Sequence, residues 1–242
     1  MVRTLLLFVT LLLFVTLLVP PAQAFELQPF SASYTADFKN APFAGTAERS
    51  LAQLRDGSWE LRFEAAMLVA RLTERSRFRI EQGALVPVSY QYSRNGLGSS
   101  RTVEQDFDWS TRQILGLRKG KAYRVPLHRG LLDRSTYQLA LQQDVARGKT
   151  SMTYQVLDET EVETYDFRVL GEENVRTRAG LIRALKVERV RDPGQSRRQT
   201  TLWFAPSWNY LLVRLHQREN DGKEYQIMLK SGEVNGEAVK GR

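Results

Sequence analysis

The feature of this sequence that most constrains its fold is a period-two alternation of apolar and polar residues along almost the whole chain. Trp59, Leu61, Phe63 and Ala65 alternate with Glu60, Arg62 and Glu64, directly after the turn signal Asp56-Gly57. Similar runs hold Val86, Val88, Tyr90 and Tyr92; Val103, Phe107 and Trp109; Met152, Tyr154 and Val156; Tyr165, Phe167 and Val169; Leu211, Val213 and Leu215; and Tyr225, Ile227 and Leu229. This spacing predicts strands with one apolar and one wet face, as in antiparallel sheets.

The turn signals between these runs indicate how the strands are connected. Glu219-Asn220-Asp221-Gly222 and Asp192-Pro193-Gly194-Gln195 each predict a hairpin. Roughly ten to twelve strands at hairpin spacing favour an all-β, mainly antiparallel fold with a single curved or closed, barrel-like sheet. An outer-membrane barrel also alternates, but its strands need about ten residues and an apolar outer band. The runs here are shorter and carry charges, so we expect a soluble sheet.

One segment, residues 135–147, departs from this alternation. Tyr137, Ala140, Leu141, Asp144 and Val145 recur at three-and-four spacing, and Gly148 follows as a stop signal. Asp133 or Ser135 can cap the start. The pattern predicts one short helix, which we expect to cover one mouth or open side of the sheet.

The first 24 residues have the layout of a secretory signal peptide. Arg3 precedes an apolar run, Leu5–Val19, and Ala22-Gln23-Ala24 offers the small residues of a cleavage site. The run is shorter than the roughly 20 residues that span a bilayer, although an uncleaved anchor is the alternative. We expect cleavage after Ala24 and a single β-rich periplasmic domain at 25–242.

The chain contains no cysteine. An exported protein without cysteine has no disulfide framework, thiolate metal site or thiol nucleophile. It also lacks the cysteine to which lipoproteins attach lipid, and no later apolar stretch reaches membrane-spanning length. We therefore expect no stable membrane insertion after cleavage.

The net charge is +8, and arginine is the main basic residue. Because the arginine fork matches phosphate and carboxylate groups, a lipid or an anionic envelope polymer is a candidate partner. A genome that favours arginine codons explains the same composition without a function. We expect no nucleic-acid partner for an exported protein.

Signatures of catalysis are sparse. His128 and His216 are the only histidines, and the sequence contains no Gly-x-Ser-x-Gly or phosphate-binding glycine loop. Asp106 and Asp108 share a strand face, which the alternation explains as a solvated face. We therefore favour a non-catalytic protein with no cofactor and no metal, and keep an envelope glycan or ester hydrolase using Asp106, Asp108 or Asp133 as a less favoured alternative.

Arg75, Arg77 and Arg79 share one face of a strand and form the sharpest local basic feature. They are the candidate basic surface for an acidic protein partner or a phosphate. The alternative is structural pairing across the sheet with acids such as Glu60, Glu64 or Glu104.

Aromatic residues are abundant on the expected inward faces. In a packed barrel they fill the core, whereas in a more open one they line a pocket for an apolar ligand. The candidate ligand-binding residues are Trp59, Tyr90, Tyr92, Trp109 and Trp203.

Several short motifs, taken in order, resemble one secreted bacterial family, the domain of unknown function DUF3108. They are Gly83–Tyr90, Phe107-Asp108-Trp109, Asp133 before the helix, Gly180 before the strand Leu185–Val190, and Trp203-Phe204-Ala205-Pro206. Family members often carry an acid after the last motif, where this chain has Ser207. The resemblance implies a periplasmic, all-β, curved-sheet protein with no established catalytic residue.

The favoured hypothesis is an accessory protein of the cell envelope that holds an apolar or amphipathic ligand in its curved sheet. The alternative is a packed structural module that binds an acidic envelope partner through its basic surface.

Overall fold

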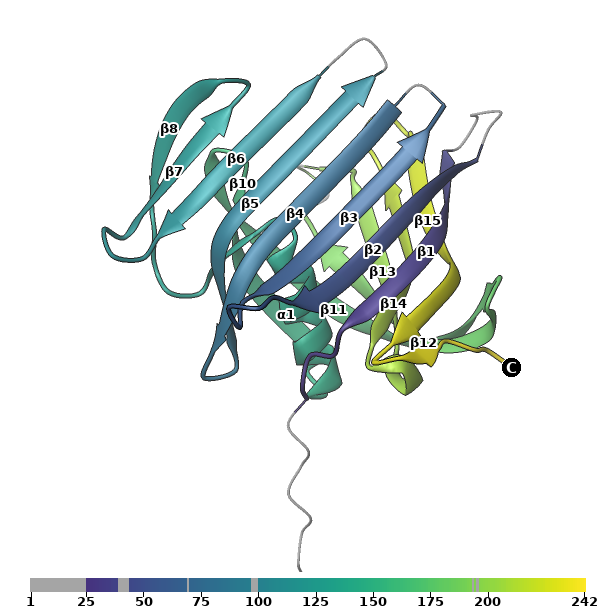
Figure 1. Cartoon of the computed structure of the whole chain (residues 1–242). Coiled ribbons are helices and arrows are strands. Elements are labelled where there is room, and N and C mark those ends of the chain that lie inside the picture. Colours follow the sequence, from purple (N-terminus) through teal and green to yellow (C-terminus); the bar gives the residue numbers. More distant parts are fainter. Residues whose placement is uncertain (1–24, 39–43, 69, 97–99, 193, 195) are drawn as a thin grey trace, which may run out of the picture.

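The structure, a computed structural model, describes residues 25–38, 44–68, 70–96, 100–192, 194 and 196–242. The predicted signal peptide, residues 1–24, lies outside this part of the chain. The described residues form one large sheet and one α-helix (Figure 1).

The strands are mostly long and follow one another along the chain. The first eight are β1 (Phe30–Phe38), β2 (Gly45–Gln53), β3 (Trp59–Met67), β4 (Ala70–Glu81), β5 (Ala84–Gly96), β6 (Arg101–Asp108), β7 (Gln113–Arg118) and β8 (Lys121–Pro126). The next four are β9 (Leu131–Asp133), β10 (Ser151–Asp158), β11 (Glu161–Thr177) and β12 (Gly180–Val190). The last four are β13 (Gln199–Ala205), β14 (Leu211–Arg218), β15 (Glu224–Val234) and β16 (Glu237–Ala238). A 3-10 turn, Pro206–Trp208, lies between β13 and β14.

The sheet runs from β8 through β1 and β15 to β9, and it does not close by a hydrogen-bonded ladder. All neighbouring strands are antiparallel except β9 and β10, which are parallel. The sheet curves so that the β1–β8 wall faces the later strands (Figure 1). The prediction of an all-β, mainly antiparallel, barrel-like fold is therefore confirmed. The sheet has 16 strands, more than expected, and two of the additional strands, β9 and β16, are too short to show alternation.

Side chains join the two ends of the sheet where the ladder is missing. Glu159, in the β10–β11 turn, forms ion pairs with Arg101 of β6 and Arg118 of β7. The Glu159 carbonyl accepts hydrogen bonds from Gln105 (2.8 Å) and Tyr123 (2.5 Å). We call this contact the Glu159 seam.

The predicted helix is present as α1, Thr136–Ala146. The Asp133 carboxylate accepts hydrogen bonds from the backbone N–H groups of Ser135 and Thr136, both at 2.8 Å. The side chains of Leu139, Leu141 and Val145 are buried against the sheet, across the lower end of the fold in Figure 1. Within the described ranges, no helix has both the length and the apolar character that a membrane span requires.

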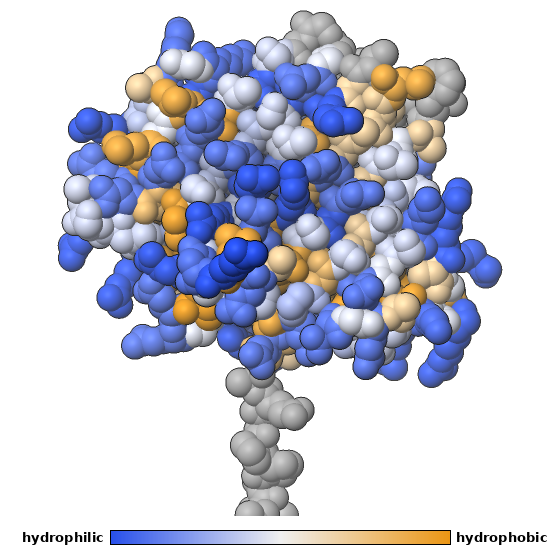
Figure 2. Space-filling view, in the orientation of Figure 1, coloured by the Kyte–Doolittle hydropathy of each residue, from blue (hydrophilic) through white to orange (hydrophobic). Residues whose placement is uncertain are grey.

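The apolar faces of the strands point inward, as the alternation predicted. One row of paired residues across the inner face is Phe30, Leu51, Leu61, Ser76 and Tyr90. Their side chains are buried, and Figure 2 shows a largely hydrophilic outer surface with scattered apolar residues.

The expected facing of Val86 and Val88 is wrong. Leu85, Pro87 and Tyr90 are the buried residues of this strand. Phe78 pairs with Pro87 while Arg77 pairs with Ser89, so Val88 is an extra residue in a β-bulge. The bulge changes which residues face inward, and period-two counting does not detect it.

Candidate functional site

The inner face above helix α1 carries charged as well as aromatic side chains. One row of paired residues across β1–β6 is Ala32, Arg49, Phe63, Glu74, Tyr92 and Val103. The next row contains Tyr34 and Ala47, which are buried, and Ala65, which is half-buried. Charged side chains therefore lie on the inner face between apolar core residues.

Glu74 and Tyr90 form a buried hydrogen-bonded pair in this region. The Tyr90 hydroxyl donates to Glu74 Oε1 at 2.6 Å. Burial raises the pKa of the Glu74 carboxyl and holds the pKa of Tyr90 well above its usual value. Glu74 nevertheless keeps some accessible surface and is half-buried.

Arg134 connects the pair to the opposite wall. Its guanidinium lies 3.0 Å from Asp158 Oδ1, and Asp158 Oδ2 accepts a hydrogen bond from the Tyr165 hydroxyl at 2.7 Å. The Arg189 guanidinium stacks 3.2 Å from the centre of the Tyr165 ring. Stacked arginine and tyrosine present a surface that is apolar on its faces and polar at its edges.

Arg49 is the most unusual member of this group. Its side chain is 3 % exposed, and its two terminal nitrogens have no hydrogen-bond partner among the described residues. The guanidinium lies 5.3 Å from the centre of the Phe30 ring. Since a buried charge without partners is costly, stability alone does not explain an arginine here. We call Arg49, Glu74, Tyr90, Arg134, Asp158, Tyr165 and Arg189 the inner polar cluster.

The family comparison agrees with the fold. The sequence profile of the family described as "Protein of unknown function (DUF3108)" matches residues 33–230. The chain belongs to the DUF3108 family. The matched residues span β1 to most of β15 and include the whole inner polar cluster.

The chain of this DUF3108 protein is similar to two solved structures, of which the first supports the barrel-like fold. A β-barrel-like protein of the DUF1849 family from Brucella abortus matches with a TM-score of 0.57 and 9% identity, over 87% of this chain and 99% of its own. Pseudomonas aeruginosa MucB, in complex with MucA, matches with a TM-score of 0.37 and 15% identity, over 88% of this chain and 54% of its own. A comparison with curated protein sequences gives no match.

The predicted ligand-binding residues do not form one pocket in this DUF3108 fold. Tyr90 and Tyr92 lie together on the inner face of β5, where the Arg134 guanidinium is 5.8 Å from the Tyr92 ring centre. Trp59 is half-buried against the core, at the start of β3. Trp109 follows the end of β6, packs against the core cluster that contains Tyr90 and Phe107, and lines a groove described below.

Trp203 is buried in the hydrophobic core, but in a different cluster from Tyr90. Its neighbours in register are Lys186 and Arg214, and both cations lie over its ring. Its Nε1–H donates to Glu173 Oε1 at 2.5 Å. Leu202 and Phe204, its neighbours in β13, belong to a second core cluster, which packs around Leu141 and Val145 of α1.

The predicted basic surface lies on the outer face, and each of its arginines has an acidic partner. Arg75 is 3.6 Å from Glu60, Arg77 is 2.5 Å from Asp56, and Arg79 is 3.0 Å from Glu81. These pairs neutralise most of the local positive charge.

The candidate catalytic carboxylates are not brought together. Asp106 is exposed on the outer face, Asp108 accepts hydrogen bonds from Ser110 and Thr111 in a turn, and Asp133 is buried at the helix start. In the part of the chain that the structure describes, no three His, Cys, Asp or Glu side chains form a group that could hold a metal ion.

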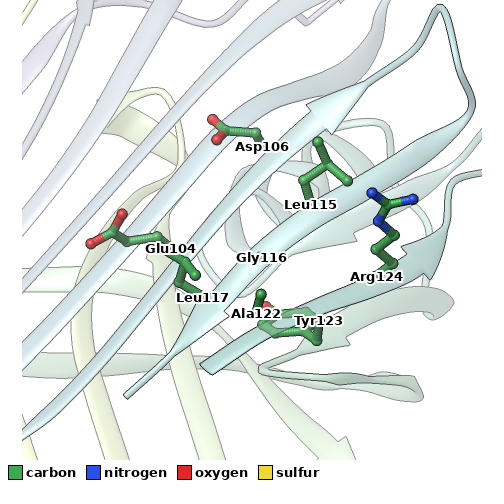
Figure 3. A pocket seen from close by; sticks show the side chains of 8 residues that line it. All are labelled: Glu104, Asp106, Leu115, Gly116, Leu117, Ala122, Tyr123 and Arg124. Carbon is green, nitrogen blue, oxygen red and sulfur yellow. The ribbon is translucent and has the colours of Figure 1, made fainter. Parts of the chain in front are cut away.

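A shallow hollow of about 380 Å³ lies on the outer face of β6–β8 (Figure 3). Exposed Leu115 and Leu117 line it beside Glu104, Asp106 and Arg124. No donors or acceptors converge there in the way a specific ligand site requires.

Sequence reasoning missed most of the inner polar cluster. Arg49 occupies an inward register position between Ala47 and Leu51, and Glu74 does the same between Leu72 and Ser76. A charge on the apolar face of an alternating run was the available signal. Arg134 and Asp158 border loops and carried no such signal.

Proposed function

We propose that this DUF3108 protein is an exported, non-catalytic accessory protein of the cell envelope that holds an amphipathic ligand against the inner face of its curved sheet. The observation that carries the proposal is the inner polar cluster, because a sheet that served only as a packed core would have no need of it. Of the predicted residues, half-buried Tyr92 is the one that we retain as a ligand contact, while Tyr90, which is 0 % exposed, positions Glu74 through its hydrogen bond.

The composition of the inner face supports an amphipathic ligand over a purely apolar one. Half-buried Phe63 and Ile227 offer apolar contact. Arg134 and Glu74 offer charged and hydrogen-bonding groups in the same interior. Ligand sites commonly combine an apolar lining with a few such polar groups.

The small side chain of Ala65 suggests a direct test. Ala65 is half-buried on the inner face of β3, so Ala65→Phe would occupy the space proposed for the ligand without removing any hydrogen bond. We expect the native protein, isolated by osmotic shock from the cells that produce it, to carry an amphiphile detectable by native mass spectrometry and by organic extraction. The Ala65→Phe protein should carry much less.

Ala52→Phe is the matched control, because Ala52 is an exposed residue of the neighbouring strand β2. It should keep the same ligand occupancy and the same melting temperature as the native protein. Native protein without any bound amphiphile, or an equal load in both variants, would count against the proposal.

A further inference from the structure

A groove of about 740 Å³ lies outside the inner face, where three connecting segments meet. The β4–β5 hairpin contributes Arg79, Glu81 and Leu85, and the β6–β7 turn contributes Trp109 and Arg112. The segment between β8 and β9 contributes residues 127–130. The volume is within the range of small-ligand sites.

The walls of the groove are held by hydrogen bonds. Leu127 N–H donates to the Arg112 carbonyl at 2.9 Å, which joins the β6–β7 turn to the end of β8. The Asp108 carboxylate accepts hydrogen bonds from Ser110 and Thr111 in the same turn. A groove formed by fixed loops presents its side chains with little ordering cost on binding.

The charge in the groove is positive and only partly neutralised. Arg79 pairs with Glu81 at 3.0 Å. Arg112 and Arg129 are exposed, and their side chains form no ion pair or hydrogen bond with any described residue. Two guanidinium groups are therefore available to an anion from solution.

Trp109 adds an aromatic surface to the same groove. Its Nε1–H donates to the Pro87 carbonyl at 2.8 Å, which fixes the orientation of the indole. The side chain is half-buried and lines the groove. A fixed indole is a flat apolar surface, and the C–H face of a sugar ring is its usual complement in water.

We propose that this groove binds an acidic saccharide, with a sugar ring against Trp109 and its carboxylate or phosphate group at Arg112 and Arg129. Arginine recognises both anions through paired N–H groups. The aromatic surface favours a saccharide over a bare inorganic anion. The site is separate from the inner polar cluster, so it can be tested independently of the proposed function.

Hexagalacturonate is a suitable probe, with maltohexaose as the neutral control of equal length. By isothermal titration calorimetry on the signal-peptide-free protein, hexagalacturonate should bind and maltohexaose should not. The double variant Arg112→Gln/Arg129→Gln should bind at least about tenfold more weakly, and Trp109→Leu should also weaken binding. Arg124→Gln, an exposed arginine of β8 outside the groove, should leave the affinity unchanged.

A second measurement needs no variant. In the native protein, the indole N–H resonance of Trp109 should shift on titration with hexagalacturonate, while that of buried Trp203 should not. Equal affinity of the double variant, equal binding of maltohexaose, or no shift of the Trp109 resonance would overturn the proposal. Phosphatidylglycerol vesicles that bind through Arg112 and Arg129 while hexagalacturonate does not would reassign the groove to a lipid surface.

Discussion

At the scale of single residues, Asp133 shows how one buried carboxyl organises its surroundings. It is 0% exposed, caps the start of α1, and accepts a 2.6 Å hydrogen bond from Ser76 of β4. Burial raises its pKa to about 6, although these hydrogen bonds act in the opposite direction. The residue that links the helix to the sheet therefore titrates in a mildly acidic range.

The raised pKa of Asp133 predicts a pH-dependent stability. Between about pH 4 and about pH 6 the folded state binds the proton more tightly than the unfolded chain, so stability falls as the pH rises through this window. The Asp133 contribution to the free energy of unfolding should fall by up to about 3 kcal/mol, at about 1.4 kcal/mol per pKa unit. The free energies of unfolding of the native protein and of Asp133→Asn, measured with urea, should differ by an amount that changes across this pH range. Parallel profiles of stability against pH for the two proteins would contradict the raised pKa of Asp133. The control is Asp106→Asn, at an exposed carboxylate.

Gly116 offers a test of packing at one residue. It pairs with Tyr123 across β7 and β8, and a Cβ added to Gly116 would overlap the Tyr123 ring. We expect Gly116→Ala to lower the free energy of unfolding by about 1–3 kcal/mol, as overpacking does. In a Tyr123→Ala background the same change should become neutral or stabilising, because glycine disfavours strands. A cost that is equal in both backgrounds would show that the ring is not the cause.

The sequence predicted the role of a residue only where that residue followed a local pattern, such as a capping residue before a helix. Asp133 and Ser135 were both candidate caps. Ser135 occupies the N-cap position without a side-chain cap hydrogen bond, and the Asp133 carboxylate accepts hydrogen bonds from the first N–H groups of the helix instead. Arg49 and Glu74 were missed because charges in alternating runs are expected on the solvent face, although each falls on the apolar side of its run.

At the scale of secondary-structure elements, alternation predicted the long strands and the three-and-four spacing predicted α1. The hairpin at Glu219–Gly222 is confirmed by the hydrogen bond from Gly222 N–H to the Glu219 carbonyl at 3.0 Å. Bulges were invisible, as Val88 shows, because an extra residue changes the facing without changing the composition. The three-residue strand β9 depends on its parallel pairing with β10, which is a long-range contact.

The Glu159 seam should control how firmly the β7–β8 hairpin is held. Glu159→Gln removes the carboxylate that pairs with Arg101 and Arg118. Arg134 is a third cation near this carboxylate, with its Nη1 3.7 Å from Glu159 Oε1. We expect a loss of about 2 kcal/mol, below the roughly 3–5 kcal/mol of a fully buried pair, because Arg101 and Arg118 are partly exposed. Amide exchange should accelerate in β7 and β8 more than in β11 and β12. Exposed Glu161→Gln is the control, and uniform acceleration would rule out a local role.

At the scale of the whole molecule, the sequence left open whether the sheet closes. Closure depends on whether the first and last strands in the sheet order meet, and those strands, β8 and β9, are short and separated by four residues, 127–130. The structure joins the two sheet ends through Glu159, Gln105 and Tyr123 instead of a ladder. Side-chain contacts of this kind have no periodic signature in the sequence. The candidate site was therefore predictable in its location on the inner face but not in its charged residues.

The packing of the first described residues supports a final prediction about export. Phe25 packs edge-on against Tyr210 with ring centres 6.1 Å apart, and Leu27 is buried. Cleavage after Ala24 would remove none of this packing, whereas a cut a few residues later would expose Tyr210 and the core beside it. N-terminal sequencing of the osmotic-shock fraction should therefore begin at Phe25. Ala24→Arg, which places a large charged side chain at the small-residue cleavage position, should leave the precursor in the membrane pellet, while Gln23→Arg should still be cleaved. An intact Met1 terminus on the native protein would show that the segment remains as an anchor.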